Sequence, residues 1–223
     1  MREKAIVLWS GGKDSALALY EVAADYDIVA LLTTVTSGYD RISMHGVRTA
    51  LLEQQAATLN YPLEQVLIPP RCTNDEYESR MRSALTRYRD AGVAHVVCGD
   101  IFLEDVRRYR EERLLGEGLK GVFPLWQRDS RALAKRFLDL GFRAVLCCID
   151  THVLDERFAG RIYDETLLAE FPPVVDPCGE NGEFHTFVFA GPNFVRAIPY
   201  SLGEYVLREE RFGYRDLLPC GDA

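Results

Sequence analysis

The sequence lacks the patterns that mark zinc sites, disulfide frameworks and membrane segments. Its six cysteines include no C-x-x-C pair and its four histidines lie far apart, so no zinc-ligand spacing is present. The apolar run near the N-terminus, residues 5–9, is too short for a signal sequence or a membrane span. We therefore expect a cytoplasmic protein with reduced thiols and no membrane partner.

Positive charge is also in short supply. The 223 residues carry 26 Lys and Arg against 34 Asp and Glu, which gives a net charge of -8. That balance disfavours broad attraction to nucleic acid, and we expect no nucleic-acid partner. With 48% hydrophobic residues, a chain of this length suits one large α/β domain, or one domain plus a smaller companion. The oligomeric state is left open.

The first part of the chain alternates short apolar runs with longer amphipathic ones, the pattern of a parallel sheet flanked by helices. Predicted strands are residues 5–9, 28–35, 65–68, 95–98 and 122–125, and predicted helices are residues 15–24, 47–59, 75–91 and 104–115. Crossovers of this length favour a right-handed, doubly wound sheet. Such a sheet binds ligands beyond the carboxyl ends of its strands.

The pattern changes after residue 126. A predicted helix (130–140), a strand (144–149) and a polar helix (158–170) lead to a stretch rich in Pro and Gly, residues 171–183. Three β-like runs follow, at 185–190, 194–198 and 205–208, with a turn signal at 191–193. We predict a larger domain over residues 1–125 and a smaller α+β domain over residues 126–223.

The loop Ser10-Gly11-Gly12-Lys13-Asp14-Ser15 lies between the first predicted strand and the first predicted helix. Adjacent glycines let the backbone approach a ligand closely, and amides at a helix N-terminus form an anion site suited to pyrophosphate. Lys13 adds a positive charge, Ser10 and Ser15 add hydroxyls, and Asp14 could hold Mg²⁺ or cap the helix. The Walker pattern is absent. The alternative is a plain strand-to-helix turn capped by Asp14 or Ser15.

This loop resembles the PP-loop of the N-type ATP pyrophosphatases, whose members include GMP synthetase, argininosuccinate synthetase and tRNA-modifying enzymes. The resemblance implies a five-stranded parallel sheet of order 3-2-1-4-5. It also implies that a substrate oxygen attacks the α-phosphorus of ATP, giving an adenylate and pyrophosphate. ATP and Mg²⁺ are the cofactors implied, with Asp14 as the candidate metal ligand.

A second set of motifs resembles the diphthine–ammonia ligase family, in matching order over nearly the whole chain. The motifs are Met44-His45-Gly46-Val47, Gly99-Asp100-Ile101 followed by Arg107, Pro124-Leu125-Trp126, and residues 178–186, which read C-G-E-N-G-E-F-H-T. That family implies amide formation, in which a carboxylate is adenylated and ammonia then displaces AMP. The substrates would be ammonia and a small or protein-borne carboxylate.

Residues 178–186 supply acid/base capacity for an incoming amine through Glu180, Glu183 and His185. The alternative to a catalytic role is a solvent-exposed acidic hairpin turn at Asn181-Gly182. The catalytic candidates are Lys13, Asp14, Glu180, Glu183 and His185. The nucleotide candidates are Ser10, Gly11, Gly12, Lys13, Asp14, Ser15 and Asp100, and the substrate candidates are His45, Arg107, Asn181, Gly182 and Thr186.

The E-N-G-E-F-H residues depart from the E-G-G-E-Y-E motif of diphthine ligases. They resemble a bacterial subgroup linked to cobalamin salvage, which implies a corrinoid acid as acceptor in place of diphthine. Two other functions are possible alternatives to the ligase. A tRNA-modifying PP-loop enzyme conflicts with the acidic charge and the absence of C-x-x-C. A non-catalytic adenine-nucleotide-binding protein would bind ATP without forming AMP.

Overall fold

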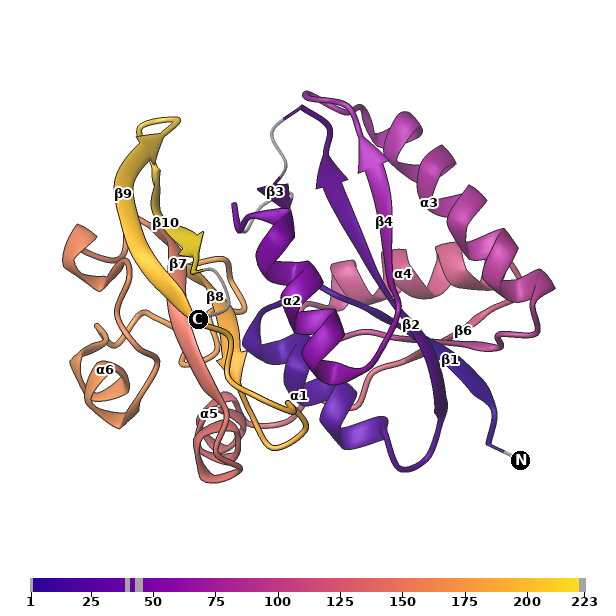
Figure 1. Cartoon of the computed structure of the whole chain (residues 1–223), viewed down its shortest axis with the longest axis horizontal. Coiled ribbons are helices and arrows are strands. Elements are labelled where there is room, and N and C mark those ends of the chain that lie inside the picture. The colour runs from indigo at the N-terminus through magenta and orange to yellow at the C-terminus, as the bar shows by residue number, and fades with distance from the viewer. Residues whose placement is uncertain (1, 39–40, 43–45, 221–223) are drawn as a thin grey trace.

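Two β-sheets lie side by side in the computed structural model, which describes residues 2–38, 41–42 and 46–220 (Figure 1). The first sheet is formed by the N-terminal part of the chain and the second by the C-terminal part. None of the helices within the described ranges combines the length and apolar character that crossing a bilayer requires.

The first sheet is built around a parallel core. Its strands are β1 (Lys4–Leu8), β2 (Asp27–Thr36), β3 (Arg41–Ile42), β4 (Leu63–Ile68), β5 (His95–Val97) and β6 (Lys120–Val122). The five parallel strands pair in the order β4-β2-β1-β5-β6, which is the 3-2-1-4-5 arrangement when parallel strands alone are counted. The sheet differs from the expectation in having the two-residue β3, which pairs antiparallel with the end of β2.

Four helices connect these strands: α1 (Lys13–Val22), α2 (Thr49–Leu59), α3 (Asn74–Asp90) and α4 (Glu104–Gly116). Local chemistry sets their ends. Thr73 and Glu76 form a reciprocal capping box at the start of α3, and Asn60, at φ 60°, ends α2 in the left-handed conformation. The first sheet reverses its strand order between β1 and β5, which places a crevice at the carboxyl ends of these two strands.

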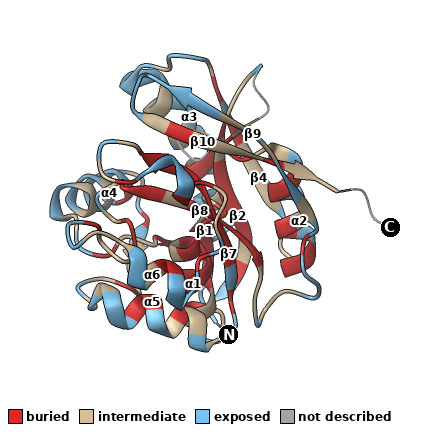
Figure 2. Cartoon of the chain, turned by 90° about the vertical axis from the view of Figure 1, so that its left-hand side faces the viewer, coloured by how far each residue is buried: buried red, intermediate tan, exposed pale blue. Residues whose placement is uncertain are grey.

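The second sheet is antiparallel, in the order β8-β7-β10-β9. Its elements are α5 (Ser130–Asp139), β7 (Arg143–Asp150), the 3-10 turn η1 (Glu156–Phe158), α6 (Glu165–Glu170), β8 (Phe184–Ala190), β9 (Tyr200–Arg208) and β10 (Phe212–Pro219). Buried residues gather on the strands and on the helix faces turned toward them, whereas β9 is mostly exposed (Figure 2).

The two sheets share one hydrophobic core. The largest cluster of buried residues joins Leu19 of α1 and Leu51 of α2 to Phe142, Val145 and Phe187 in the C-terminal part. A smaller cluster, with Leu32 and Leu85 among its members, lies under α3 and α4 on the other face of the first sheet. Because the large core spans both parts, α1 and β8 are fixed against each other.

Three sequence expectations in the C-terminal part were wrong. The helix predicted over residues 158–170 is broken into η1 and α6, with Gly160 between them at φ 91°. Residues 194–198 form no strand. Ile198 N donates to Phe189 O, and Val195 N donates to Thr58 O of α2. Strand β10 was not predicted, because its Gly, Arg, Asp and Pro residues interrupt the apolar alternation.

Candidate active site

The phosphate loop, residues 10–15, turns sharply after β1 at Gly11, whose φ is 76°. A Cβ on Gly11 would lie 2.7 Å from Gln55 Oε1, so both the conformation and the space require glycine. The Gly11 carbonyl accepts hydrogen bonds from Val188 N of β8 and from Gln55 Nε2, both at 2.9 Å. The loop is therefore held from two sides.

Gln55 supports the phosphate loop, and the sequence reasoning missed it. Its side chain on α2 is wholly buried and makes three bonds, two to the connection between β1 and α1 and one to β8. Nε2 donates to Gly11 O and, at 2.6 Å, to Val188 O, while Oε1 accepts from Trp9 Nε1 at 3.0 Å. The sequence feature that could have revealed it is a glutamine on the mainly apolar face of a predicted helix. Burying a glutamine there costs free energy unless each of its polar atoms has a hydrogen-bond partner.

The loop's hydroxyls bond to the loop itself. Ser10 Oγ and Ser15 Oγ lie 3.2 Å apart, Gly12 N donates to Ser10 Oγ, and Ser15 Oγ donates to Gly12 O. Lys13 N, the first amide of α1, donates to Thr186 Oγ1 of β8 at 3.0 Å. Gly12, at the N-cap, has no side chain to cap α1, and Thr186 engages the first amide alone, so the rest of this helix N-terminus suits an anion.

Lys13 is almost completely buried, with 4% of its surface exposed. Its ammonium group donates to both oxygens of Asp14, at 2.9 and 2.8 Å, and to the carbonyl of Cys178. Burial by itself would lower the pKa of Lys13, but the charge of Asp14 outweighs it and raises that pKa, so the lysine stays charged. An ammonium group has three donors, and all three are engaged.

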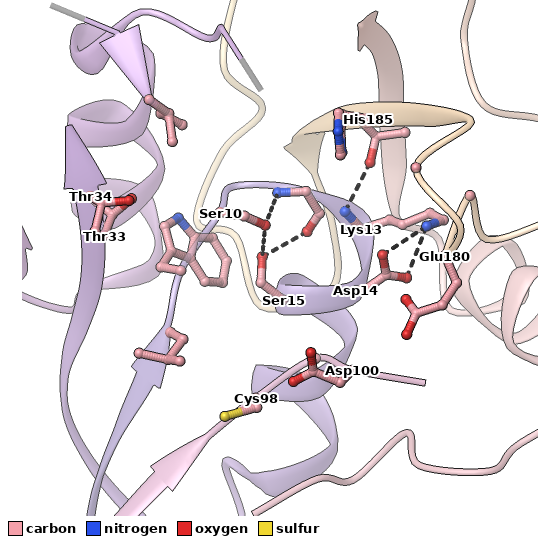
Figure 3. Close-up of a pocket in the computed structure, with 18 of the residues that line it drawn as sticks. Ser10, Lys13, Asp14, Ser15, Thr33, Thr34, Cys98, Asp100, Glu180 and His185 are labelled. Carbon is pink, nitrogen blue, oxygen red and sulfur yellow. Dashed lines mark hydrogen bonds and ion pairs between the residues drawn. The ribbon is translucent and has the colours of Figure 1, made fainter. Parts of the chain in front are cut away.

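Asp14, Asp100 and Glu180 bring three carboxylates to the other end of the loop (Figure 3). Gly99 makes this approach possible, because a Cβ there would lie 2.9 Å from the carbonyl carbon of Asp14. Burial raises the pKa of Asp14 against the opposing effect of Lys13. Burial also raises the pKa of Glu180, and the charges of Asp14 and Asp100 add to the increase.

The 178–186 segment uses many of its polar groups to build its own loop. Glu183, 5% exposed, accepts three hydrogen bonds: Oε1 from Asp176 N and Asn181 Nδ2, and Oε2 from Asn181 N. Gly179 and Gly182 have φ values of 69° and 88°, which bend the loop around this carboxylate. Glu183 does not line the cleft, so its placement fits a structural role; its expected acid/base role stays a prediction.

Ionisation is suppressed in two other residues of this segment, His185, which lines the cleft, and Cys178, which does not. Burial, with Lys13 nearby, lowers the pKa of His185 to about 4, so its imidazole is neutral at neutral pH. Burial raises the pKa of Cys178 to about 12, although Lys13 opposes the shift, so this thiol is not a nucleophile. All six cysteines are free thiols.

These residues enclose a cleft of about 520 Å³, a size usual for a small-molecule site. Its walls come from the phosphate loop, the ends of β2 and β5, α3, α4 and the 178–186 segment. Thr33 and Thr34 of β2 lie across the cleft from Glu180 (Figure 3), and the buried Thr33 Oγ1 has no hydrogen-bond partner within the described chain. The charged lining residues are two cations, Lys13 and Arg110, and the three carboxylates.

The expected site residues divide into four groups by their place in the structure. Ser10, Gly12, Lys13, Asp14, Ser15, Asp100, Glu180, Asn181, Gly182, His185 and Thr186 line the cleft. Gly11 and Glu183 support it from behind. Arg107 lies outside the lining, where its guanidinium stacks on Phe123 and Trp126 at 4.8 and 4.5 Å and pairs with Glu111. His45 falls outside the described residues.

The fold and the cleft define a class: an α/β protein with a phosphate-binding loop at the switch point of a doubly wound sheet. Family comparison makes the class specific. The model of the diphthamide synthase N-terminal domain matches residues 3–120, and that of the diphthamide synthase C-terminal domain matches residues 129–214. The chain belongs to the diphthamide synthase family.

Individual relatives are distant. The human diphthine–ammonia ligase is 25% identical over 231 residues, which cover 93% of this chain and 85% of the human protein. The Schizosaccharomyces pombe diphthine–ammonia ligase is 28% identical over 218 residues, which cover 87% of this chain but 36% of that protein. A predicted tRNA methyltransferase subunit from Methanocaldococcus jannaschii superposes with a TM-score of 0.44 at 16% identity, covering 63% of this chain and 77% of the other, a likeness that identifies no function.

Proposed function

We propose that this protein is an ATP-dependent acid–ammonia ligase. It activates a carboxylate as an adenylate, releases pyrophosphate, and forms an amide as ammonia displaces AMP. The observation that carries the proposal is the N-terminus of α1 behind the phosphate loop, which has no side-chain cap from its own N-cap residue Gly12 and faces a cleft shared with the 178–186 segment. Its amides suit the leaving pyrophosphate, and family membership supplies the reaction class.

The charges of the cleft fit a need for Mg²⁺. Three carboxylates and two cations line it, so polyphosphate binding calls for added positive charge. No set of three or more His, Cys, Asp or Glu side chains is arranged to hold a metal in residues 2–38, 41–42 and 46–220. Mg²⁺ typically takes one or two carboxylates together with phosphate oxygens and waters. Asp14, with 31% of its side chain exposed, would hold it, and the ion would neutralise the polyphosphate.

For the acceptor we propose a corrinoid acid rather than diphthine. His185 lies where the diphthine-type motif has a carboxylate, and it is neutral at neutral pH. A neutral imidazole attracts a cationic diphthine side chain less than a carboxylate would. Candidate corrinoid acids and a diphthine-containing elongation factor should therefore be compared at equal concentration. Faster AMP release with the elongation factor would contradict this acceptor while leaving the ligase chemistry standing.

The products of ATP decide the reaction class. With ATP labelled at the α-phosphate, ammonium and Mg²⁺ present, and a panel of candidate acids, we expect labelled AMP and an equal amount of pyrophosphate in step with amide. Chromatography separates AMP from ADP. ADP and orthophosphate in step with amide would refute the proposal, and tight ATP binding with no AMP from any acid would favour a nucleotide-binding role.

A further inference from the structure

The carboxylates of Asp100 and Glu180 lie close together because of the backbone between them. Glu180 Oε1 accepts hydrogen bonds from Ile101 N at 2.8 Å and Phe102 N at 3.2 Å, the two residues that follow Asp100. Glu180 comes from the 178–186 segment and Asp100 from the end of β5, so the two parts of the chain meet here. Figure 3 shows both carboxylates at the same end of the cleft.

Each of these carboxylates keeps one oxygen without a partner. Asp100 Oδ1 accepts from Arg110 Nε at 3.0 Å, whereas the buried Oδ2 has no hydrogen-bond partner within the described chain, and only 10% of the side chain is exposed. Glu180 Oε2 accepts no bond from a described residue, while Oε1 is held by two amides. A buried, unpaired carboxylate oxygen is costly and calls for a donor.

A small cation carrying N–H donors meets this demand better than a bare metal ion. Mg²⁺ needs oxygens at about 2.0–2.1 Å in near-ideal octahedral geometry, and the described acidic residues present no such set. An ammonium ion bonds carboxylates at about 2.7–2.9 Å and tolerates a looser arrangement. The broad χ2 of aspartate lets Oδ2 turn toward the cleft, and the Oδ1 bond to Arg110 shifts with it.

We propose that Asp100 and Glu180 form a binding site for the ammonium ion that serves as the nitrogen donor. Oδ2 of Asp100 and Oε2 of Glu180 accept its N–H bonds, with the remaining donors facing the cleft. The catalytic use of the site rests on the proposed ligase function, whereas the binding of ammonium does not. Asp14, whose two oxygens are engaged by Lys13, is left for the metal–phosphate side of the cleft.

In the reaction, ammonium transfers one proton to the Glu180 carboxylate and leaves ammonia. The nitrogen lone pair forms the C–N bond to the acyl carbon as the C–O bond to AMP breaks. The proton that the nitrogen then loses passes to solvent. Burial and the neighbouring charges of Asp14 and Asp100 raise the pKa of Glu180, which helps it to accept a proton.

Ammonium binding can be measured without ATP or an acceptor. Thermal unfolding is followed in ammonium chloride and in tetramethylammonium chloride, which lacks N–H donors, at equal ionic strength. We expect ammonium alone to raise the midpoint of the wild-type protein in a saturable way. Asp100→Asn and Glu180→Gln should each weaken the apparent affinity at least tenfold. Asp105→Asn, an equal change at an exposed position on α4, should leave it unchanged.

Glu180→Gln keeps an acceptor for the amides of Ile101 and Phe102, so we expect it to fold. The test therefore remains decisive even if the Asp100→Asn variant misfolds. Crystals soaked in rubidium chloride give a second readout, since Rb⁺ is close to ammonium in size; an anomalous peak should lie between the two carboxylates. No preference for ammonium over tetramethylammonium, an unchanged affinity in Glu180→Gln, or loss of the ammonium effect in saturating Mg²⁺ would overturn the site. Ammonium binding here without AMP release from any acid would instead count against the proposed function alone.

Discussion

The phosphate loop and the 178–186 segment face each other across the cleft but use their polar groups in opposite ways. The loop places Gly12, which has no side chain to cap the helix, at the N-cap of α1. Most polar groups of the segment make hydrogen bonds within the protein. Glu183 accepts bonds from its own loop, Thr186 accepts one from Lys13 N, and the Cys178 carbonyl accepts one from the Lys13 ammonium group. Only part of a motif that reads as catalytic is therefore presented to a ligand.

The largest effect should come from Lys13→Ala. The change leaves the half-buried Asp14 without its cation beside the phosphate loop, so ATP-dependent AMP formation should fall at least about a hundredfold per folded molecule. Circular dichroism should also show a lower midpoint, because breaking a buried ion pair costs roughly 3 kcal/mol. Lys135→Ala removes an exposed lysine of α5 and serves as the control. If Lys13→Ala formed AMP near the wild-type rate, the loop would have no part in the reaction.

Gln55→Leu tests whether the loop depends on support from α2. It removes both donors to Gly11 O and Val188 O and leaves the Trp9 indole N–H unpaired. We expect ATP affinity, measured by calorimetry, to fall roughly tenfold, with a stability loss of about 1–3 kcal/mol. Gln55→Glu should be at least as damaging, because its carboxylate faces two carbonyl oxygens. Gln65→Leu, at a bond near the surface, should change neither quantity.

The contrast between Glu183 and Glu180 separates structure from chemistry within one motif. Glu183→Gln places an amide NH₂ against backbone N–H groups, so the unfolding free energy should drop by about 1–3 kcal/mol. Glu180→Gln keeps a carbonyl acceptor for Ile101 N and should cost less than about 1 kcal/mol while slowing amide formation roughly a hundredfold. Denaturant titration and an AMP-release assay give both numbers. If Glu183→Gln instead slowed amide formation and left stability unchanged, Glu183 would have the acid/base role.

The smallest effect concerns the contact between the two sheets at Asp216. Burial alone would raise the pKa of Asp216, but hydrogen bonds from Arg48 and Arg41 prevail and lower that pKa to about 2. The folded-state pKa is lowered, so the stabilisation is present above about pH 4, the unfolded value, and is lost as pH falls toward 2.

Asp216→Asn should therefore be less stable than wild type by roughly 1–2 kcal/mol at pH 7, and the difference should vanish near pH 2. Urea unfolding at a series of pH values measures it. A difference that persists at pH 2 would mean that packing, rather than charge, holds β10 to Arg41 and Arg48.

Much of the first sheet could be read from the sequence because its signals are local. Residues 4–22 carry an apolar strand, two glycines and an amphipathic helix in direct succession, and the structure has β1, the loop and α1 in that order. The C-terminal sheet was harder. Its strand β10 pairs with β7, more than 60 residues earlier in the chain, and the helix predicted over residues 158–170 is interrupted where residues 160–163 hydrogen-bond to β7.

The sequence by itself determined the phosphate loop, since its glycines, lysine and serines act through the backbone on either side of them. Only the tertiary structure decided which distant side chains reach that loop. Gln55, Thr186 and the Cys178 carbonyl do so because one hydrophobic core joins α2 and β8 to α1. Asp100 meets Glu180 because Gly99 lets β5 approach α1 and two backbone amides hold the glutamate. These contacts depend on packing between segments up to 173 residues apart in the chain, which no local pattern encodes.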